Sequence, residues 1–194
     1  MIFAAMSIAA LTGFRDDRWD DIRVPVQSAS LLGFSDPDWV QLVNDGASSR
    51  GVYALAFDGS TAVEEVFVAV QLPHDWKQES AIYPHLHWAP SSAADCNVKW
   101  QMEYSFQEID GVFGNTTTIT VTDSSDSTDR KHLVAEFPAI DMTGVTSVSA
   151  MLTFRIFRDP TDGADTCTAD AFLLEADVHY IRDARGSILQ FSKT

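Results

Sequence analysis

The sequence contains few cysteines, few basic residues and little helical periodicity. Its 194 residues include 2 cysteines, and 13 Lys and Arg stand against 28 Asp and Glu, which gives a formal net charge of −15. Two cysteines are too few for a disulfide framework. Cys96 and Cys167 could form one bridge, but two buried free thiols are the alternative that we favour in a chain of this length.

The shortage of basic residues narrows the classes of partner. A chain with a pI near 4.4 is repelled by the phosphates of nucleic acid and by the headgroups of anionic membranes. We therefore expect no nucleic acid and no membrane among its partners. The acidic excess instead fits a solvated surface, cation binding, or docking onto a basic protein.

The first residues, Met1 to Phe14, are apolar. A secretory signal peptide would carry a basic residue ahead of its apolar segment, but the first basic residue here is Arg15. A transmembrane helix would need a longer run, of about twenty apolar residues. We predict that residues 1–18 form an N-terminal arm, which packs on a neighbouring subunit or on its own domain. Residues 19–194 are expected to form a single domain.

Apolar and polar residues alternate over short runs through most of that domain. Between Val98 and Phe106 every second side chain is apolar, as in a strand with one buried face. About eight or nine such runs predict an all-β fold, an antiparallel jelly-roll β-sandwich. The runs lie near residues 51–57, 65–71, 83–89, 98–106, 116–122, 131–137, 147–158, 169–181 and 188–191.

Two further local predictions concern the ends of the domain. Residues 37–43 could form one short helix, with Asp36 as its N-cap and Pro37 at its first position. The run 169–181 is expected to place five apolar side chains on one face: Phe172, Leu174, Ala176, Val178 and Tyr180.

The polar faces of four predicted strands carry an unusual number of ionisable groups. If these strands are neighbours, one sheet presents a face that is either open to water or pressed against an identical face in an oligomer. Charged groups at such an interface fix register more than they add affinity. The candidate interface residues are His85, His87, Gln101, Glu103, Arg155, Glu175, Asp177 and His179.

The tripeptide His85-Leu86-His87 is the sharpest local motif. Residues i and i+2 of a strand point to the same side, so both imidazoles could reach one metal ion, with His179 as a third candidate ligand. Cupins, which are also jelly rolls, use an HxH pair with a Glu and a later His. Here no acidic residue follows His87 at the cupin interval, and no Pro-x-Gly turn precedes His179. We therefore expect these histidines to contact a subunit or polar neighbours, with no metal and no cofactor.

Motifs of nucleophilic catalysis and of phosphate binding are also missing. The chain has no Gly-x-Ser-x-Gly, no phosphate loop and no Gly-x-Gly-x-x-Gly. Carboxylates from different strands could still pair, as glycosidases require. We expect a structural or binding module, not an enzyme.

Three segments resemble a pattern found in proteins of tailed bacteriophages: residues 71–76 (QLPHDW), 83–88 (YPHLHW) and 97–104 (NVKWQMEY). The segment 19–25 (WDDIRVP) is similar to the start of those proteins, and the resemblance extends over residues 19–191. It implies a jelly-roll virion protein that inherits no catalytic residues.

Within that group the chain is most similar to capsid cement or decoration proteins. The resemblance implies a homotrimer that sits on the outer capsid surface, binds the major capsid protein and stabilises the shell. A tail-fibre, head-fibre or receptor-binding module of the virion is the alternative. A cupin-like metal-dependent enzyme or a carbohydrate-active sandwich is the third hypothesis.

Overall fold

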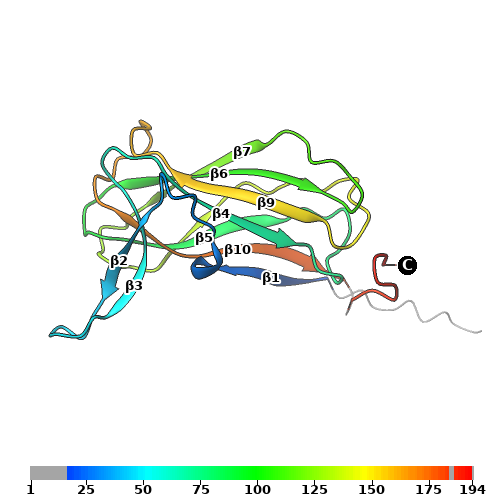
Figure 1. Ribbon diagram of the computed structural model, residues 1–194, viewed down its shortest axis with the longest axis horizontal. Helices are drawn as coiled ribbons and strands as arrows, with labels where there is room; N and C mark the ends of the chain where they lie inside the picture. Colours follow the sequence, from blue (N-terminus) through cyan, green and yellow to red (C-terminus); the bar gives the residue numbers. More distant parts are fainter. Residues whose placement is uncertain (1–16, 184–185, 194) are drawn as a thin grey trace, which may run out of the picture.

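The computed structural model describes residues 17–183 and 186–193 (Figure 1). Within these residues the chain forms ten strands and one short 3-10 turn. The elements are β1 (Arg18–Pro25), η1 (Val26–Ser28), β2 (Asp38–Val43), β3 (Val52–Phe57), β4 (Glu64–Gln71), β5 (Tyr83–Pro90), β6 (Asn97–Gln107), β7 (Thr117–Ser124), β8 (Leu133–Glu136), β9 (Met151–Arg158) and β10 (Ala171–Arg182).

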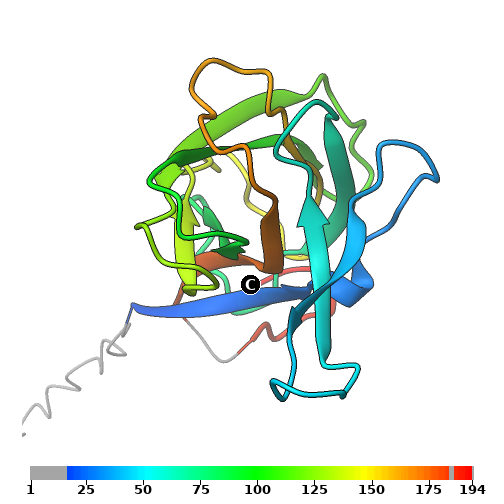
Figure 2. The same cartoon turned by 90° about the vertical axis from the view of Figure 1, so that its left-hand side faces the viewer.

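The strands form two antiparallel sheets. The larger has the order β2-β3-β10-β5-β8, with β1 also paired to β10, and the smaller has the order β4-β9-β6-β7. Strands pair as one nested hairpin, β6 with β7, β5 with β8, β4 with β9 and β3 with β10. That hairpin wraps so that β10 lies beside β5 and β9 beside β6, which makes it a jelly roll. The predicted fold class is confirmed, and Figure 2 shows the two sheets facing each other.

Large aromatic side chains fill the space between the sheets. Trp76, Trp88, Trp100 and Phe57 are all 0% exposed, and the rings of Phe57 and Trp100 meet edge to face at 5.2 Å. Each fully buried side chain of this size contributes about 2 to 3 kcal/mol relative to an exposed one. Because the core positions of β5 and β6 are taken by these rings, the polar residues that alternate with them point outward.

Strand β10 contains a β-bulge that changes which of its side chains face the core. Its register with β5 shifts between Leu173 and Glu175, where its other neighbour changes from β3 to β1. Leu173 and Ala176 both pack in the main core, whereas Phe172 and Leu174 join a small second cluster outside it. The predicted single apolar face is therefore wrong for Phe172 and Leu174, because one extra residue inverts the alternation.

The short helix predicted for residues 37–43 is also wrong, since this segment is strand β2. Its β-branched and aromatic residues pair with β3 instead. Asp36, the expected N-cap, accepts hydrogen bonds from the backbone N–H groups of Leu32 and Gly33, which precede it, at 3.0 and 2.8 Å. The carboxylate therefore does not accept a hydrogen bond from the residues that follow it, as the N-cap of a helix would.

The last predicted strand, near residues 188–191, is not formed. This segment is irregular, with Ile188, Leu189 and Phe191 exposed, and both edges of β10 are already occupied by β1, β3 and β5. Most of the predicted N-terminal arm, residues 1–16, lies outside the described residues, and its final residue, Arg18, begins β1. No helix among the described residues is long and apolar enough to cross a membrane.

The preference for free thiols is wrong, because Cys96 and Cys167 form a disulfide with a Cα–Cα distance of 5.0 Å. The bridge joins the start of β6 to the loop between β9 and β10, across a sequence separation of 71 residues. Chain entropy arguments assign about 4 kcal/mol of stabilisation to closing a loop of that length.

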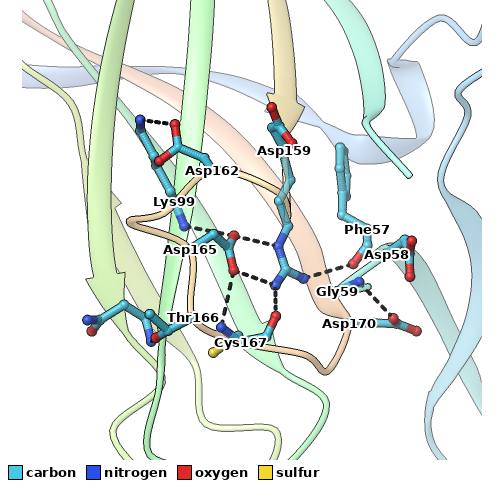
Figure 3. A network of polar contacts seen from close by, with 12 residues as sticks. Phe57, Asp58, Gly59, Lys99, Asp159, Asp162, Asp165, Thr166, Cys167 and Asp170 are labelled. Atoms are coloured by element: carbon cyan, nitrogen blue, oxygen red, sulfur yellow. Dashed lines mark hydrogen bonds and ion pairs between the residues drawn. The ribbon is translucent and has the colours of Figure 1, made fainter. Parts of the chain in front are cut away.

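A buried ion pair beside the disulfide fixes the same loop. Arg158 and Asp165 have 0% exposed side chains, and Nε and Nη2 of Arg158 donate to the two carboxylate oxygens at 2.8 and 2.9 Å. The remaining donors reach the backbone carbonyls of Phe57, Ala169 and Cys167, so all five N–H groups of the guanidinium are satisfied. Figure 3 shows Asp165 and Cys167 of the β9–β10 loop and Phe57 of β3 among the acceptors around this guanidinium.

Candidate functional site

The structure divides the eight candidate interface residues between two opposite surfaces. Strands β5 and β10 belong to the larger sheet, and β6 and β9 to the smaller. The expectation of one shared ionisable face is therefore wrong, because alternation reveals the side of a strand but not the sheet it joins. His85, His87, Glu175, Asp177 and His179 lie on the larger sheet, and Gln101, Glu103 and Arg155 on the smaller.

On the smaller sheet the charged groups neutralise one another. Arg155 pairs with Glu65 and, at 3.3 Å, with Glu103. Its guanidinium carbon lies 4.0 Å from the ring centroid of Phe157, a cation–π contact. Glu103 also accepts a hydrogen bond from the hydroxyl of Thr116. Arg155 and Glu103 are therefore engaged in contacts within the sheet, which is typical of residues with a structural role.

On the larger sheet, cross-strand register builds a more concentrated site. Asp177 of β10 lies between Arg23 of β1 and His85 of β5, and His85 lies opposite Glu136 of β8. Residues in direct register share a face of the sheet. We call the resulting surface the histidine face, formed by Trp19, Asp21, Arg23, Tyr83, His85, His87, His132, Glu136, Glu175, Asp177 and His179.

Asp177 is the centre of this face. Its Oδ2 lies 3.6 Å from Nε2 of His85 and 3.3 Å from Nε2 of His87. Asp177 and His85 are only 6% and 4% exposed. Among the described residues, Oδ1 of Asp177 is one of the few buried polar atoms without a hydrogen-bond partner. A buried carboxylate oxygen in this state carries a desolvation cost that no hydrogen bond within the described residues offsets.

The electrostatics follow from that burial. Desolvation raises the pKa of Asp177, and the nearby carboxylate of Glu175 raises it further. Desolvation also lowers the pKa of His85, and the adjacent imidazole of His179 acts in the same direction. Both shifts favour the neutral forms of groups that would otherwise attract each other.

The remaining histidines surround this centre. His179 does not face Asp177 as a third ligand would, because its Nε2 pairs with Asp21 at 2.8 Å while its ring lies 4.2 Å from that of His85. Nδ1 of His87 lies 2.6 Å from Nε2 of His132. Strand alternation did not assign His132 or Asp21 to this face, because His132 lies in the loop between β7 and β8 and Asp21 lies on β1.

Two hollows open on the histidine face. One, of about 450 Å³, is lined by residues that include Trp19, Tyr83, His85 and His179. The other, of about 560 Å³, lies over His87 and Asp177. At the edge of the first, Trp19 is 60% exposed and meets Tyr83 edge to face at 5.1 Å. The face thus offers an exposed aromatic pair, convergent imidazoles and carboxylates on one open sheet surface.

In the comparisons with known proteins, the chain is similar to solved structures in backbone arrangement only. No protein-family model and no curated protein sequence matches the chain. Solved structures with a similar arrangement include a chain of infectious bursal disease virus, Gx strain (10% identity, 88% of this chain and 33% of that one, TM-score 0.42). Another is an endo-1,4-beta-D-xylanase of Clostridium thermocellum with its CBM22-1 and GH10 modules (7% identity, 88% of this chain and 27% of that one, TM-score 0.38). A third is latent PorU of Porphyromonas gingivalis (10% identity, 87% of this chain and 13% of that one, TM-score 0.39).

The chain thus spans a third or less of the length of these three structures. All of the TM-scores lie below 0.5.

Proposed function

We propose that the chain is a structural virion protein of a tailed bacteriophage, a cement protein that decorates the outer capsid surface. It assembles as a homotrimer and binds the major capsid protein. The resemblance of residues 19–191 to such proteins supports this proposal, as does the jelly-roll strand order, an architecture common in viral shells.

The exposed aromatic pair on the histidine face is the observation that carries the proposal. Trp19 and Tyr83 are 60% and 37% exposed, and charged groups, including Arg23 and Glu175, lie on the same face. Exposed Trp and Tyr within a polar rim are typical of association surfaces, where such residues contribute most of the binding energy. The face is therefore suited to contact another protein, with the ion pairs setting register.

The same geometry favours a binding role over an enzymatic one. The space between the sheets, where a jelly-roll enzyme could enclose a substrate, is occupied by Trp88, Trp100 and Phe57. The convergent histidines lie outside this core, on the outer side of the larger sheet. No motif in the sequence places a nucleophile beside them.

A decoration protein would stabilise a shell by adding buried contact area between itself and the capsid subunits that it bridges. A binding partner specific for the assembled state shifts the equilibrium toward that state by mass action. Because a shell offers many equivalent positions, trimeric binding gives avidity even when each contact is weak. The formal charge of −15 keeps such a protein soluble and repels released DNA.

The test compares capsid binding by the wild type with binding by Trp19→Ser and Tyr83→Ser. Capsids lacking the chain are mixed with each purified protein, and the bound copies are counted after sedimentation. We expect saturable binding by the wild type and at least a tenfold loss of affinity in both variants. Trp39→Ser is the matched control, since Trp39 is 45% exposed on β2, outside the histidine face. Equal binding by all four proteins would contradict the proposed surface.

A fibre or receptor-binding module of the virion is the second candidate, and the β2–β3 hairpin favours it. The hairpin projects from one end of the sandwich in Figure 1. It carries Trp39 and Tyr53, which are 45% and 41% exposed. Both residues lie on the paired strands of the hairpin, and exposed aromatic side chains on a projecting element are suited to contact a receptor. Loss of binding to host cells by Trp39→Ser, together with a few copies per particle instead of hundreds, would support this candidate.

A further inference from the structure

We propose that His85, His87 and Asp177 form a binding site for a divalent transition metal ion, of which Zn²⁺ is the occupant best suited to the donors. One ligand atom from each residue lies within 4.8 Å of the others. This inference goes beyond the proposed function and does not depend on it.

The distances fit one ion shared by three ligands. Zn²⁺ binds His nitrogen and carboxylate oxygen at roughly 2.0 to 2.2 Å in a tetrahedron, which places neighbouring ligand atoms about 3.3 Å apart. Oδ2 of Asp177 lies 3.6 Å from Nε2 of His85 and 3.3 Å from Nε2 of His87. Two of the three distances between ligand atoms therefore lie close to the tetrahedral value, and the third is within 4.8 Å.

The hydrogen-bonding state of the residues also favours a cation at this position. Oδ1 of Asp177 is buried without a hydrogen-bond partner among the described residues, and a metal ion would compensate the charge of this carboxylate. His87 is oriented by His132, whose Nε2 lies 2.6 Å from Nδ1 of His87. If the proton of this contact lies on Nδ1 of His87, Nε2 presents a lone pair toward Asp177. Metal-binding histidines commonly donate their other ring N–H to a neighbouring acceptor, which orients the ring.

The surrounding charge favours a cation over an anion. Glu175, Asp21 and Glu136 lie on the same face, and Arg23 is engaged by Glu175 at 2.6 Å. The paired strands hold the backbone positions of the three ligands in place. His85 and His87 are adjacent outward positions of β5, and Asp177 is paired directly with His85. The hollow of about 560 Å³ over His87 and Asp177 leaves room for the fourth ligand, a water molecule in a site with three protein ligands.

The test measures Zn²⁺ bound to the full-length, tag-free protein. The metal is removed with a chelator, the protein is equilibrated with micromolar Zn²⁺, and bound zinc is counted by elemental analysis after gel filtration. We expect about one Zn²⁺ per chain, and an upward shift of the melting temperature of about 5 to 10 °C at 100 times the dissociation constant. Co²⁺ in place of Zn²⁺ should give the visible absorption of a low-symmetry site.

Two variants and one control locate the site. His87→Gln and Asp177→Asn should each reduce affinity at least 100-fold and abolish the melting shift. The unliganded melting temperature of His87→Gln should stay close to that of the wild type, because the His87 side chain is 25% exposed. His74→Gln is the matched control, since His74 lies in another loop and contacts Ser149 and Ser187; it should bind Zn²⁺ as the wild type does.

The proposal is overturned if the wild type retains no zinc under these conditions, or if His87→Gln and Asp177→Asn bind it as tightly as the wild type. Either result leaves the proposed association function standing, because that function is measured by capsid binding of the Trp19 and Tyr83 variants.

Discussion

The buried pair of Arg158 and Asp165 offers the clearest quantitative prediction, through the substitution Asp165→Asn. The carboxylate accepts four hydrogen bonds, from Nε and Nη2 of Arg158 and from the backbone N–H groups of Lys99 and Cys167. Asparagine has almost the same shape, but one oxygen is replaced by an NH₂ group that must face two donors. The charge of Arg158 then remains in the core without a counter-ion.

The magnitude follows from the complete burial of both side chains. Removing one partner of a buried ion pair costs about 3 to 5 kcal/mol, because the remaining charge is desolvated without compensation. For a chain of 194 residues this corresponds to a melting temperature lower by about 6 to 20 °C. The disulfide at Cys167 keeps the loop attached, so the substitution should destabilise the domain without detaching this segment.

The assay is equilibrium unfolding in urea, followed by tryptophan fluorescence with the disulfide kept oxidised. Asp162→Asn is the matched control in the same loop, because the Lys99–Asp162 pair is partly exposed, at 19% and 29%. Such a solvent-exposed pair adds little to stability, so Asp162→Asn should change the free energy of unfolding far less than Asp165→Asn does. A loss below about 1 kcal/mol for Asp165→Asn, or an equal loss for both variants, would refute the reasoning.

Two further predictions concern the cross-link and the pH dependence of stability. Replacing both Cys96 and Cys167 by Ser should lower the free energy of unfolding by about 4 kcal/mol in urea titrations; a loss under about 1 kcal/mol would show that the bridge does not constrain the unfolded chain. Burial raises the pKa of Glu64 from 4.5 to about 7, so the folded chain binds this proton more tightly than the unfolded one, and stability falls as the pH rises from about 4.5 to about 7. Glu64→Gln keeps an acceptor for the N–H of Asp58. After allowance for partial solvent exposure, this variant should be more stable than the wild type by about 1 kcal/mol at pH 8, with no gain at pH 4. An equal change at both pH values would show that the raised pKa of Glu64 is not the cause.

Much of the sheet structure could be predicted because strand alternation is a local property. The run containing Trp100 and Met102 predicts β6 with the correct inward face, and the same holds for Trp88 in β5. The bulge at residues 173–175 was not predictable, because it depends on β10 changing neighbours from β3 to β1. The free-thiol preference failed for a similar reason, since proximity of the two cysteines is decided by the fold.

The candidate site could be predicted only in part. The pattern His85-Leu86-His87 correctly indicates two imidazoles on one side of a strand, and Asp177 lies opposite them. His132 comes from a loop. Asp21 is far from its partner His179 in the sequence, and the two meet only because β1 pairs with β10. Assigning Gln101, Glu103 and Arg155 to the same face failed because sheet membership is a property of the topology.

An electron microscopy reconstruction of the intact virus particle tests the central claim most directly. It should reveal trimers of this chain outside the shell, with Trp19 and Tyr83 buried against a neighbouring subunit or the major capsid protein. A particle in which the chain is absent, or in which those two side chains face solvent in every copy, would contradict the account.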